Sequence, residues 1–387
     1  MSAFDYIGLA PRLLQKGGRA PLYFEFVTTA GCNARCGHCR FGTDERQNGE
    51  LSIDELDKIS ASMGRLLVFS ATGGEPFLRT DLAEIVKVFH RNTRPVQVNI
   101  PTNGSLTGRV LDGTREILDA CPDLDLNLRV SIDDIGQDHD RARGYPGLFE
   151  KAIRTYRELK IVEPHFPRLS VSIQITVSGH NHAGLDRLYD YLRACAGVDS
   201  VVTVLVRGAP QDPGARYTPR FDPAASRLDI SSYEQFNARL EKDRRAGRLG
   251  DSRSAPLAAE ARAAASICPR VIARMTRERR WEMPCHAGAL GGIMHSNGDV
   301  FACELLTDKG LGNVRDVDYD FGKLWRSKRA AEVRSWISRS HCYCTHESQL
   351  AVNILANPRL YPLLLKERLA PGLGPPARTA TRVSPPS

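Results

Sequence analysis

Between residues 22 and 207, short apolar runs alternate with stretches in which apolar residues recur every three or four positions. The short runs are rich in β-branched and aromatic residues and predict strands, whereas the longer spacing predicts amphipathic helices. The predicted strands are PLYFEFVTT, RLLVFSATGG, VQVNIPTNG, LDLNLRVSID, RLSVSIQITVS and DSVVTVLVRG. Six strand–helix units in succession predict an α/β fold with a parallel sheet covered by helices.

Six units are two short of a closed eightfold barrel, so we expect an open, partial (β/α)6 barrel. In barrels of this kind the functional residues lie at the carboxyl ends of the strands. Each predicted strand ends in a polar or glycine-rich signature, namely AGC, TGGEP, PTNG, SIDD, TVSG and VRGAP. The site is therefore expected at this end of the barrel. Ser52 followed by Glu55 predicts a capping box at the start of the first helix.

The rest of the chain changes character twice. A Pro/Gly-rich connection after the barrel leads into charged, alanine-rich helical sequence, and a compact cysteine-bearing segment follows. In that segment SNGD lies between GGIMH and VFACELL, which predicts a hairpin. The expected organisation is an N-terminal segment 1–21, a barrel 22–207, a mostly helical insertion 208–282, an auxiliary domain 283–348, a C-terminal helix 349–370 and a disordered tail 371–387.

The composition is that of an ordinary globular protein, with 42% hydrophobic and 25% charged residues in 387. The net charge of +8 is spread along the chain among acidic residues, which favours solvated helix faces over a nucleic-acid surface. The sequence shows neither a signal peptide nor an apolar run of the roughly 18 residues that a membrane span needs. We therefore expect a cytoplasmic protein without a membrane or nucleic-acid partner.

The ten cysteines indicate the chemistry of the protein, because thiols in a reducing compartment favour metal binding or catalysis over disulfides. Seven of them fall into two groups, and the other three are interpreted as buried structural thiols. The first group is Cys32, Cys36 and Cys39, the second is Cys285, Cys303, Cys342 and Cys344, and the scattered three are Cys121, Cys195 and Cys268.

The first group has C-x3-C-x2-C spacing in a single loop after the first strand. Structural zinc is one interpretation, with His38 as the fourth ligand, but zinc ligands usually come from two separate knuckles. A [4Fe–4S] cluster is also held by thiolates, and three thiolates would leave one iron open to another ligand. We favour the cluster.

This loop, placed after the first strand of a six-unit barrel, resembles the radical S-adenosylmethionine (SAM) superfamily. The second strand ends in Gly73-Gly74-Glu75-Pro76, which is similar to the GGEP segment of that family. The resemblance implies that Gly73, Gly74 and Glu75 contact the amino group of SAM. It also implies a [4Fe–4S] cluster held by three cysteines and by exchangeable SAM.

Other positions match the family in the same region. His38 lies where the family often has an aromatic residue near adenine, although it could also face solvent. Ser131 and Arg143 resemble contacts to the ribose and carboxylate of SAM, and a surface ion pair is the alternative for Arg143. Asn103 and Val206 end the third and sixth strands and are candidates for the SAM pocket, and Val206 could also be core.

The second group resembles the auxiliary-cluster extension called SPASM, or its shorter twitch form, with CHAG at Cys285 and GNV further on. Four thiols imply one auxiliary [4Fe–4S] cluster, and zinc remains the alternative. The final C-x-C pair departs from the commoner C-x2-C, which leaves open whether Cys268 replaces one ligand. His346 and Glu347 are interpreted as neighbours of this cluster or as a helix cap.

The resemblance implies a radical SAM oxidoreductase that cleaves SAM reductively to a 5′-deoxyadenosyl radical and abstracts hydrogen from its substrate. The substrate would be a peptide or a small natural product, and the outcome oxidation, crosslinking or epimerisation in a biosynthetic pathway. Only about 20 residues precede the first strand, so a leader-binding domain is not expected. The expected electron donor is a flavodoxin or ferredoxin, and no catalytic side chain is assigned. The alternatives are a tRNA- or cofactor-modifying radical SAM enzyme and a zinc-stabilised binding protein.

Overall fold

The computed structural model describes residues 20–39, 49–207, 228–250, 258–278 and 281–369. Most of the expected N-terminal segment and the expected disordered tail lie outside the described residues. So does the Pro/Gly-rich connection at 208–227.

All six predicted strands are present, and they form one sheet with three further strands. The order across the sheet is β6-β5-β4-β3-β2-β1-β7-β8-β9, and β1 to β6 pair in parallel. In the described part of the chain, β6 and β9 are the two edges of the sheet and do not pair with each other. The barrel is therefore open, as expected. The strands are β1 (Tyr23–Val27), β2 (Val68–Thr72), β3 (Gln97–Thr102), β4 (Asp125–Ser131), β5 (Leu169–Val177), β6 (Val201–Leu205), β7 (Gly291–Met294), β8 (Asp299–Phe301) and β9 (Gly310–Asn313).

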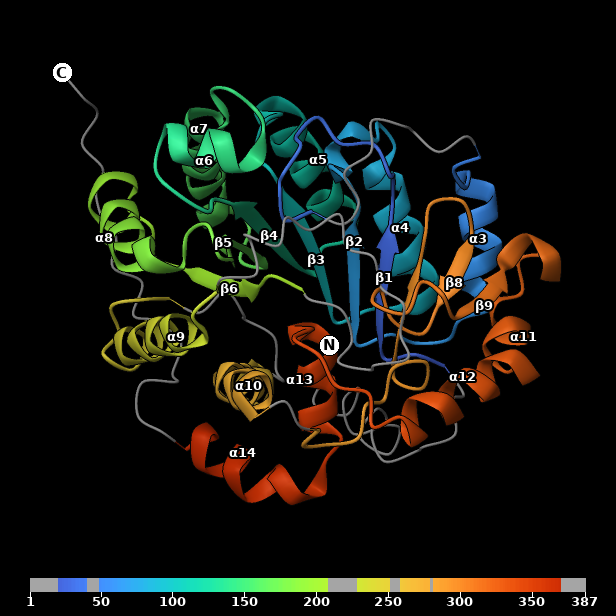
Figure 1. Cartoon of the computed structure of the whole chain (residues 1–387). Coiled ribbons are helices and arrows are strands. Elements are labelled where there is room, and N and C mark those ends of the chain that lie inside the picture. Colours follow the sequence, from blue (N-terminus) through green and yellow to red (C-terminus); the bar gives the residue numbers. More distant parts are fainter. Residues whose placement is uncertain (1–19, 40–48, 208–227, 251–257, 279–280, 370–387) are drawn as a thin grey trace.

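Helices cover the outer face of the parallel strands (Figure 1). The alternation along β4 shows why: Leu126, Leu128 and Val130 are buried in the apolar core, whereas Arg129 lines a cavity on the inner face. These helices are α3 (Ile53–Ala61), α4 (Leu82–Thr93), α5 (Thr107–Ala120), α6 (Gln137–Arg143), α7 (Leu148–Val162) and α8 (Leu185–Ala196), with 3₁₀ turns η1 (Pro76–Leu78), η2 (Glu163–His165) and η3 (His182–Gly184).

The predicted capping box at α3 is confirmed. The Ser52 hydroxyl accepts the backbone N–H of Glu55, and the Glu55 carboxylate accepts the backbone N–H of Ser52 at 2.8 Å. Apolar residues of α3 and α4 then pack onto the sheet, where the rings of Phe69 and Phe89 stack with centroids 4.2 Å apart.

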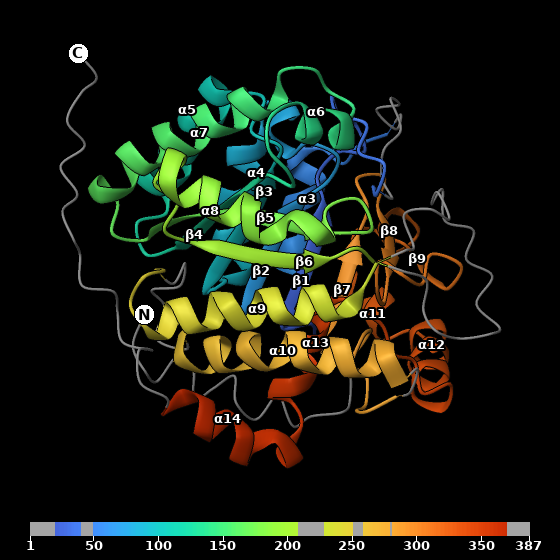
Figure 2. The same ribbon diagram turned by 60° about the vertical axis from the view of Figure 1, so that its left-hand side comes forward.

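A second helical layer lies beyond β6 and consists of α9 (Ile230–Arg245), α10 (Ala258–Glu278) and α14 (Tyr361–Arg368), as Figure 2 shows. Glu367 on α14 connects this layer, because it pairs with Arg245 on α9 and Arg270 on α10, both at 2.7 Å. The prediction of one helix over 349–370 is wrong. The chain forms α13 (Glu347–Leu355), η6 (Pro358–Leu360) and α14 instead, because Pro358 has no N–H to continue the helix.

The predicted hairpin is confirmed as β7 and β8, which pair antiparallel around Gly298 at φ +92°. Strand β7 also pairs in parallel with β1, so the cysteine-bearing segment continues the barrel sheet. Gly292 on β7 allows this packing, because a Cβ atom there would lie 2.6 Å from the Trp325 ring. The segment ends in η5 (Val314–Val317), α11 (Phe321–Trp325) and α12 (Lys328–Arg339).

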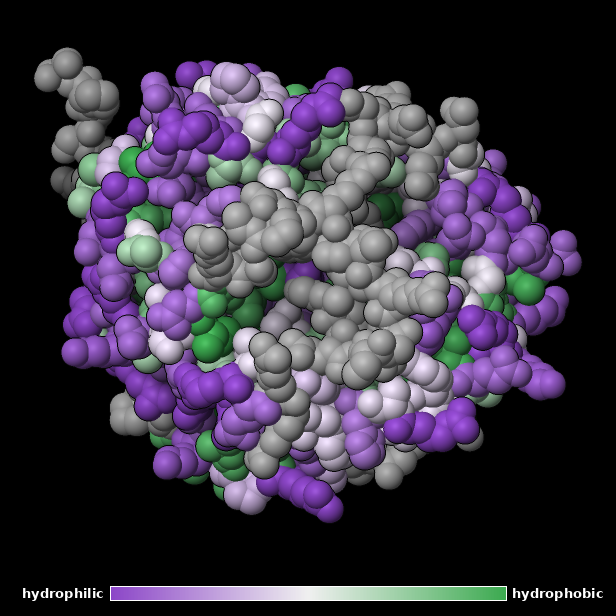
Figure 3. All heavy atoms as spheres, viewed as in Figure 1, coloured by the Kyte–Doolittle hydropathy of each residue, from purple (hydrophilic) through white to green (hydrophobic). Residues whose placement is uncertain are grey.

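Figure 3 shows a mostly hydrophilic face with small, separate hydrophobic areas. Within the described residues, none of the helices combines the length and the apolar character that crossing a bilayer requires.

Candidate functional site

The first cysteine group lies in a loop that begins where β1 ends. Backbone hydrogen bonds join this loop to the end of β2: Gly74 N–H donates to the Thr29 carbonyl and Glu75 N–H to the Gly31 carbonyl, both at 2.9 Å. A Cβ atom at residue 74 would lie 2.1 Å from the Gly31 oxygen, so only glycine permits this approach. The GGEP segment and the cysteine loop are therefore one backbone unit.

The end of α6 contacts the loop through a second set of backbone hydrogen bonds. Arg35 N–H donates to the Arg143 carbonyl at 2.8 Å, and Gly37 N–H donates to the Ala142 carbonyl at 3.1 Å. Gly144 follows at φ +59°, where a Cβ atom would lie 2.8 Å from the Arg35 oxygen. Two strand ends and one helix end thus fix the loop that carries the three thiols.

The thiols of this loop have the environment of ligand sulfurs. Burial raises the pKa of Cys32 to about 11, and its sulfur accepts the N–H of Ala34 at 3.4 Å. Burial also raises the pKa of Cys36, and the nearby Arg143 guanidinium partly offsets this shift. Buried thiolates need compensating positive charge, and iron supplies it in a cluster. These residues fit a thiolate-bound iron–sulfur group.

Glu75 connects the GGEP segment to the end of β3. Its carboxylate accepts the backbone N–H of Asn103 at 2.7 Å, the Thr102 hydroxyl at 2.8 Å and the Phe77 N–H at 3.2 Å. The side chain is 1% exposed, and burial raises its pKa to about 7. Asn103 in turn donates from its amide to Asn33 in the cysteine loop, at 2.8 Å. Glu75 and Asn103 thus lie together at the cysteine loop.

Arg143 is buried and forms an ion pair, but not on the surface. Its Nε donates to Asp133 Oδ2 at 2.8 Å, and Nη2 lies 2.8 Å from the same oxygen. His38 Nε2 lies 3.9 Å from that oxygen, and burial lowers the pKa of His38 to about 4. His38 therefore lies beside this pair, with only 13% of its side chain exposed to solvent. Ser131 is buried at the end of β4.

A cavity of about 330 Å³ lies on the inner face of the sheet. Residues from all six barrel strands and from α9, α10 and α13 line it, so the second helical layer covers one side of the barrel interior. His38 and Val206 both line the cavity, and Val206 N–H donates to the Val177 carbonyl at 2.8 Å. The volume is within the usual range for a small-molecule pocket.

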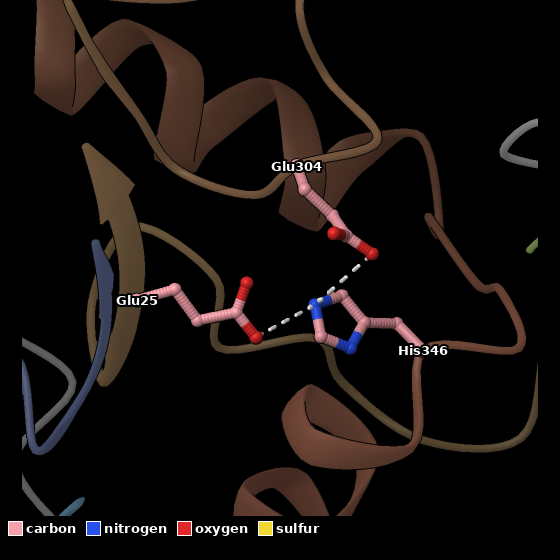
Figure 4. Close-up of side chains that lie close together, drawn as sticks. All are labelled: Glu25, Glu304 and His346. Atoms are coloured by element: carbon pink, nitrogen blue, oxygen red, sulfur yellow. Dashed lines mark ion pairs between the residues drawn. The ribbon is translucent and has the colours of Figure 1, made fainter. Parts of the chain in front are cut away.

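Charged side chains meet in this cavity beside the second cysteine group. His346 Nε2 lies 3.7 Å from Glu304 and 3.9 Å from Glu25, as Figure 4 shows. Arg207 pairs with Glu304 and lies 3.9 Å from Glu347, whose pKa is raised to about 7 by burial. His346 also caps α13, since its Nδ1 accepts the Gln349 N–H at 3.4 Å, which confirms its interpretation as a helix cap.

Sequence reasoning missed Glu25, Arg207 and Glu304. A charged residue in the centre of the apolar strand YFEFV could have marked Glu25, because alternate strand residues face the interior. Glu304 and Arg207 lie far apart in the sequence and meet only in the folded chain, so no local pattern indicates that they form a pair.

The second cysteine group is gathered in the structure. Burial raises the pKa values of Cys303 and Cys344 well above normal, and the thiol of Cys285 adds to both shifts. Cys342 adds to the shift at Cys344. By contrast, the thiol of Cys268 donates a hydrogen bond to the Glu347 carbonyl at 3.6 Å. A thiolate that binds a metal has no proton and could not donate this bond.

Three of these sulfurs share one local geometry with Cys32. Each accepts a hydrogen bond from the backbone N–H two residues further along the chain, and such bonds stabilise a thiolate. The pairs are Cys285 with Ala287, Cys303 with Leu305 at 3.5 Å, and Cys344 with His346. These residues fit a second thiolate-bound metal group.

Comparisons with known proteins concern the part of the chain that carries the first cysteine group. Residues 26–192 match the family model of the Radical SAM superfamily. An AdoMet-dependent heme synthase of Methanosarcina barkeri is 33% identical over 48% of this chain and 51% of its own length. The mycofactocin maturase MftC of Mycobacterium ulcerans is 27% identical over 82% of this chain and 78% of its own length.

Two solved structures share the fold. SuiB of Streptococcus suis, solved with bound S-adenosylmethionine, has a TM-score of 0.57 at 15% identity and covers 87% of this chain and 74% of its own. The enzyme anSMEcpe, solved with bound AdoMet, has a TM-score of 0.54 at 16% identity and covers 81% and 82% of the two chains.

Residues 26–192 thus form a domain of the Radical SAM superfamily, and the chain is an enzyme. The cofactors of that superfamily are a [4Fe–4S] cluster and S-adenosylmethionine. The chain spans about half the length of the heme synthase and about four fifths of MftC.

Proposed function

We propose that this chain is a radical SAM oxidoreductase in which Cys32, Cys36 and Cys39 hold a [4Fe–4S] cluster. The observation that carries this proposal is the backbone unit formed by the cysteine loop and the GGEP segment, which leaves room for glycine alone at residue 74. Bound there with SAM, the cluster would supply the electron that cleaves SAM to methionine and a 5′-deoxyadenosyl radical.

The chain's own residues prepare the SAM pocket. Gly73, Gly74 and Glu75 present the end of β2 to the amino group of SAM, and the Glu75 carboxylate acts by fixing the backbone of Asn103 rather than as a free anion. His38, Ser131 and Val206 remain proposed contacts for the rest of SAM. Helices α9 and α10 line one side of the interior where hydrogen abstraction would occur and would limit the access of water to it.

We also propose that Cys285, Cys303, Cys342 and Cys344 hold one auxiliary [4Fe–4S] cluster. Closed ligation by four thiolates leaves no site for substrate, so this cluster would accept the electron from a substrate radical. The buried N–H···S geometry at Cys285, Cys303 and Cys344 supports it.

The substrate proposed first is a peptide, because the similarity to MftC extends over most of both chains and SuiB is also known bound to its precursor peptide SuiA. The reaction would be an oxidation, crosslink or epimerisation. A small molecule or cofactor precursor is the second candidate, and the higher identity to the heme synthase over half of each chain favours it. Turnover assays with a peptide and with a tetrapyrrole as probes discriminate between the two.

Iron analysis after anaerobic reconstitution tests the two-cluster proposal. About eight iron atoms per chain are expected, falling to about four in Cys303→Ala. Cys195→Ala, at an exposed cysteine, and Cys268→Ala should both retain the full content. A protein that binds zinc and no iron, or a Cys303→Ala variant with unchanged iron content, would contradict the proposal.

A further inference from the structure

Asp133 is a buried carboxylate beside the cysteine loop, where its Oδ2 lies 3.9 Å from His38 Nε2. It is 2% exposed. Its Oδ1 accepts the Thr176 N–H at 2.8 Å and its Oδ2 accepts Arg143 Nε at 2.8 Å. Its own N–H donates to His139 Nδ1 at 3.0 Å, and its carbonyl accepts from the Asn181 amide at 2.9 Å. The carboxylate therefore has a fixed position.

Arg143 is fixed from two directions. Its side chain is bound by Asp133, and its backbone carbonyl accepts the N–H of Arg35 in the cysteine loop at 2.8 Å. The residue is 6% exposed, so its positive charge is shielded from water. An arginine stays charged even when buried. Helix α6 therefore places a permanent cation beside the loop.

The cation and the carboxylate both lie beside the loop. Asp133 Oδ2 is 3.9 Å from Nε2 of His38, which lies between Cys36 and Cys39 in the sequence. The backbone carbonyl of Arg143 accepts the N–H of Arg35, the residue before Cys36, at 2.8 Å. The pair Asp133–Arg143 thus supplies two opposite fixed charges beside the first cysteine group.

We propose that Asp133 and Arg143 are positioning residues that set the reduction potential of the first cluster, with opposite signs. Reduction adds one negative charge to a cluster, and a fixed cation in a low-dielectric interior stabilises the reduced form, while a fixed anion opposes it. Arg143 would raise the potential and Asp133 would moderate that rise. This inference rests on the proposed function and assigns Arg143 a role that does not require contact with SAM.

The test is a redox titration of the reconstituted full chain, monitored by electron paramagnetic resonance in the absence of SAM. The first cluster is recognised as the signal that changes when SAM is added. Arg143→Gln is expected to lower its midpoint potential, and Asp133→Asn to raise it. Arg143→Lys, which keeps the charge, should stay near the unaltered protein. Arg141→Gln is the matched control, because Arg141 lies on the same helix with a side chain 71% exposed, and no shift is expected.

Opposite shifts in Arg143→Gln and Asp133→Asn support the inference, because loosening of the loop would move both potentials in one direction. Shifts of the same sign would overturn it. So would an unchanged potential in Arg143→Gln combined with weaker SAM binding, which would make Arg143 a SAM ligand instead. An unaltered protein without any SAM-responsive cluster would overturn the proposed function as well, so the two failures are distinguishable.

Discussion

At the scale of single residues, Glu75 acts as a structural anchor inside the site. Its carboxylate accepts two backbone N–H groups and one hydroxyl, and burial still raises its pKa to about 7. A free glutamate has a pKa of about 4.3. Between these two values the folded protein keeps a proton that the unfolded chain has released. The Glu75 contribution therefore lowers stability as pH rises through this interval, and the penalty is constant above it.

Glu75→Gln should remove this dependence. Urea unfolding of cluster-free protein across the interval is expected to show a flatter decline of the free energy of unfolding with rising pH than in the unaltered protein. Glu84→Gln is the control, because the Glu84 side chain is 51% exposed and its removal should leave the slope unchanged. Parallel slopes for the unaltered protein and Glu75→Gln would contradict the role given to this carboxyl.

Arg207 compensates the carboxylates Glu304 and Glu347 in the cavity. Replacing one partner of a buried ion pair leaves the other charge uncompensated, so Arg207→Met should lower the free energy of unfolding by about 3 kcal/mol. Arg187→Met removes a similar side chain that is 65% exposed, and a change within about 0.5 kcal/mol is expected. Equal losses in denaturant unfolding would show that Arg207 has no special role.

At the scale of elements, the site depends on how closely the end of β2 approaches the cysteine loop. Gly74→Ala would put a Cβ atom 2.1 Å from the Gly31 oxygen, so the two segments would have to separate. We expect Gly74→Ala to lose most of the iron of the first cluster while the auxiliary cluster is retained. Gly37→Ala, in the same loop but with no atom near the added Cβ, should load normally. Normal iron content in Gly74→Ala would refute this account of the loop.

The elements themselves were largely predictable from the sequence. Six strands, the hairpin and the capping box at Ser52 follow from local patterns of apolar and polar residues. The cysteine loop and GGEP segment were also found locally, because each is a short motif at a strand end. The contact of Arg207 with Glu304 was not, because it joins segments 97 residues apart whose proximity depends on the packing of the whole sheet. The contact of Arg143 with Asp133 spans ten residues and depends on how α6 folds back onto the end of β4. Pro358 was a local signal for the end of a helix, but the apolar pattern around it led to the prediction of one continuous helix.

At the scale of the whole molecule, β7 joins the cysteine-bearing segment to the barrel. Its pairing with β1 places the second cysteine group next to the strand from which the first group follows. One continuous sheet thus joins the two segments that carry the cysteine groups.

Gly292→Ala tests this connection, because the added Cβ atom would lie 2.6 Å from the Trp325 ring behind β7. Overpacking of this kind typically lowers the free energy of unfolding by about 1–3 kcal/mol. Gly310→Ala is the control, since its nearest atom would be 3.4 Å away in ordinary contact. Thermal unfolding should separate the two variants, and equal stabilities would argue against tight packing at β7.

The central claim is that the first cysteine group supports reductive cleavage of SAM. The most direct measurement is the formation of 5′-deoxyadenosine by the anaerobically reconstituted protein with dithionite and SAM. The unaltered chain should form it, and a variant carrying Cys32→Ala, Cys36→Ala and Cys39→Ala should form none while retaining the iron of the auxiliary cluster. Formation of 5′-deoxyadenosine by that variant at the rate of the unaltered chain would contradict the account.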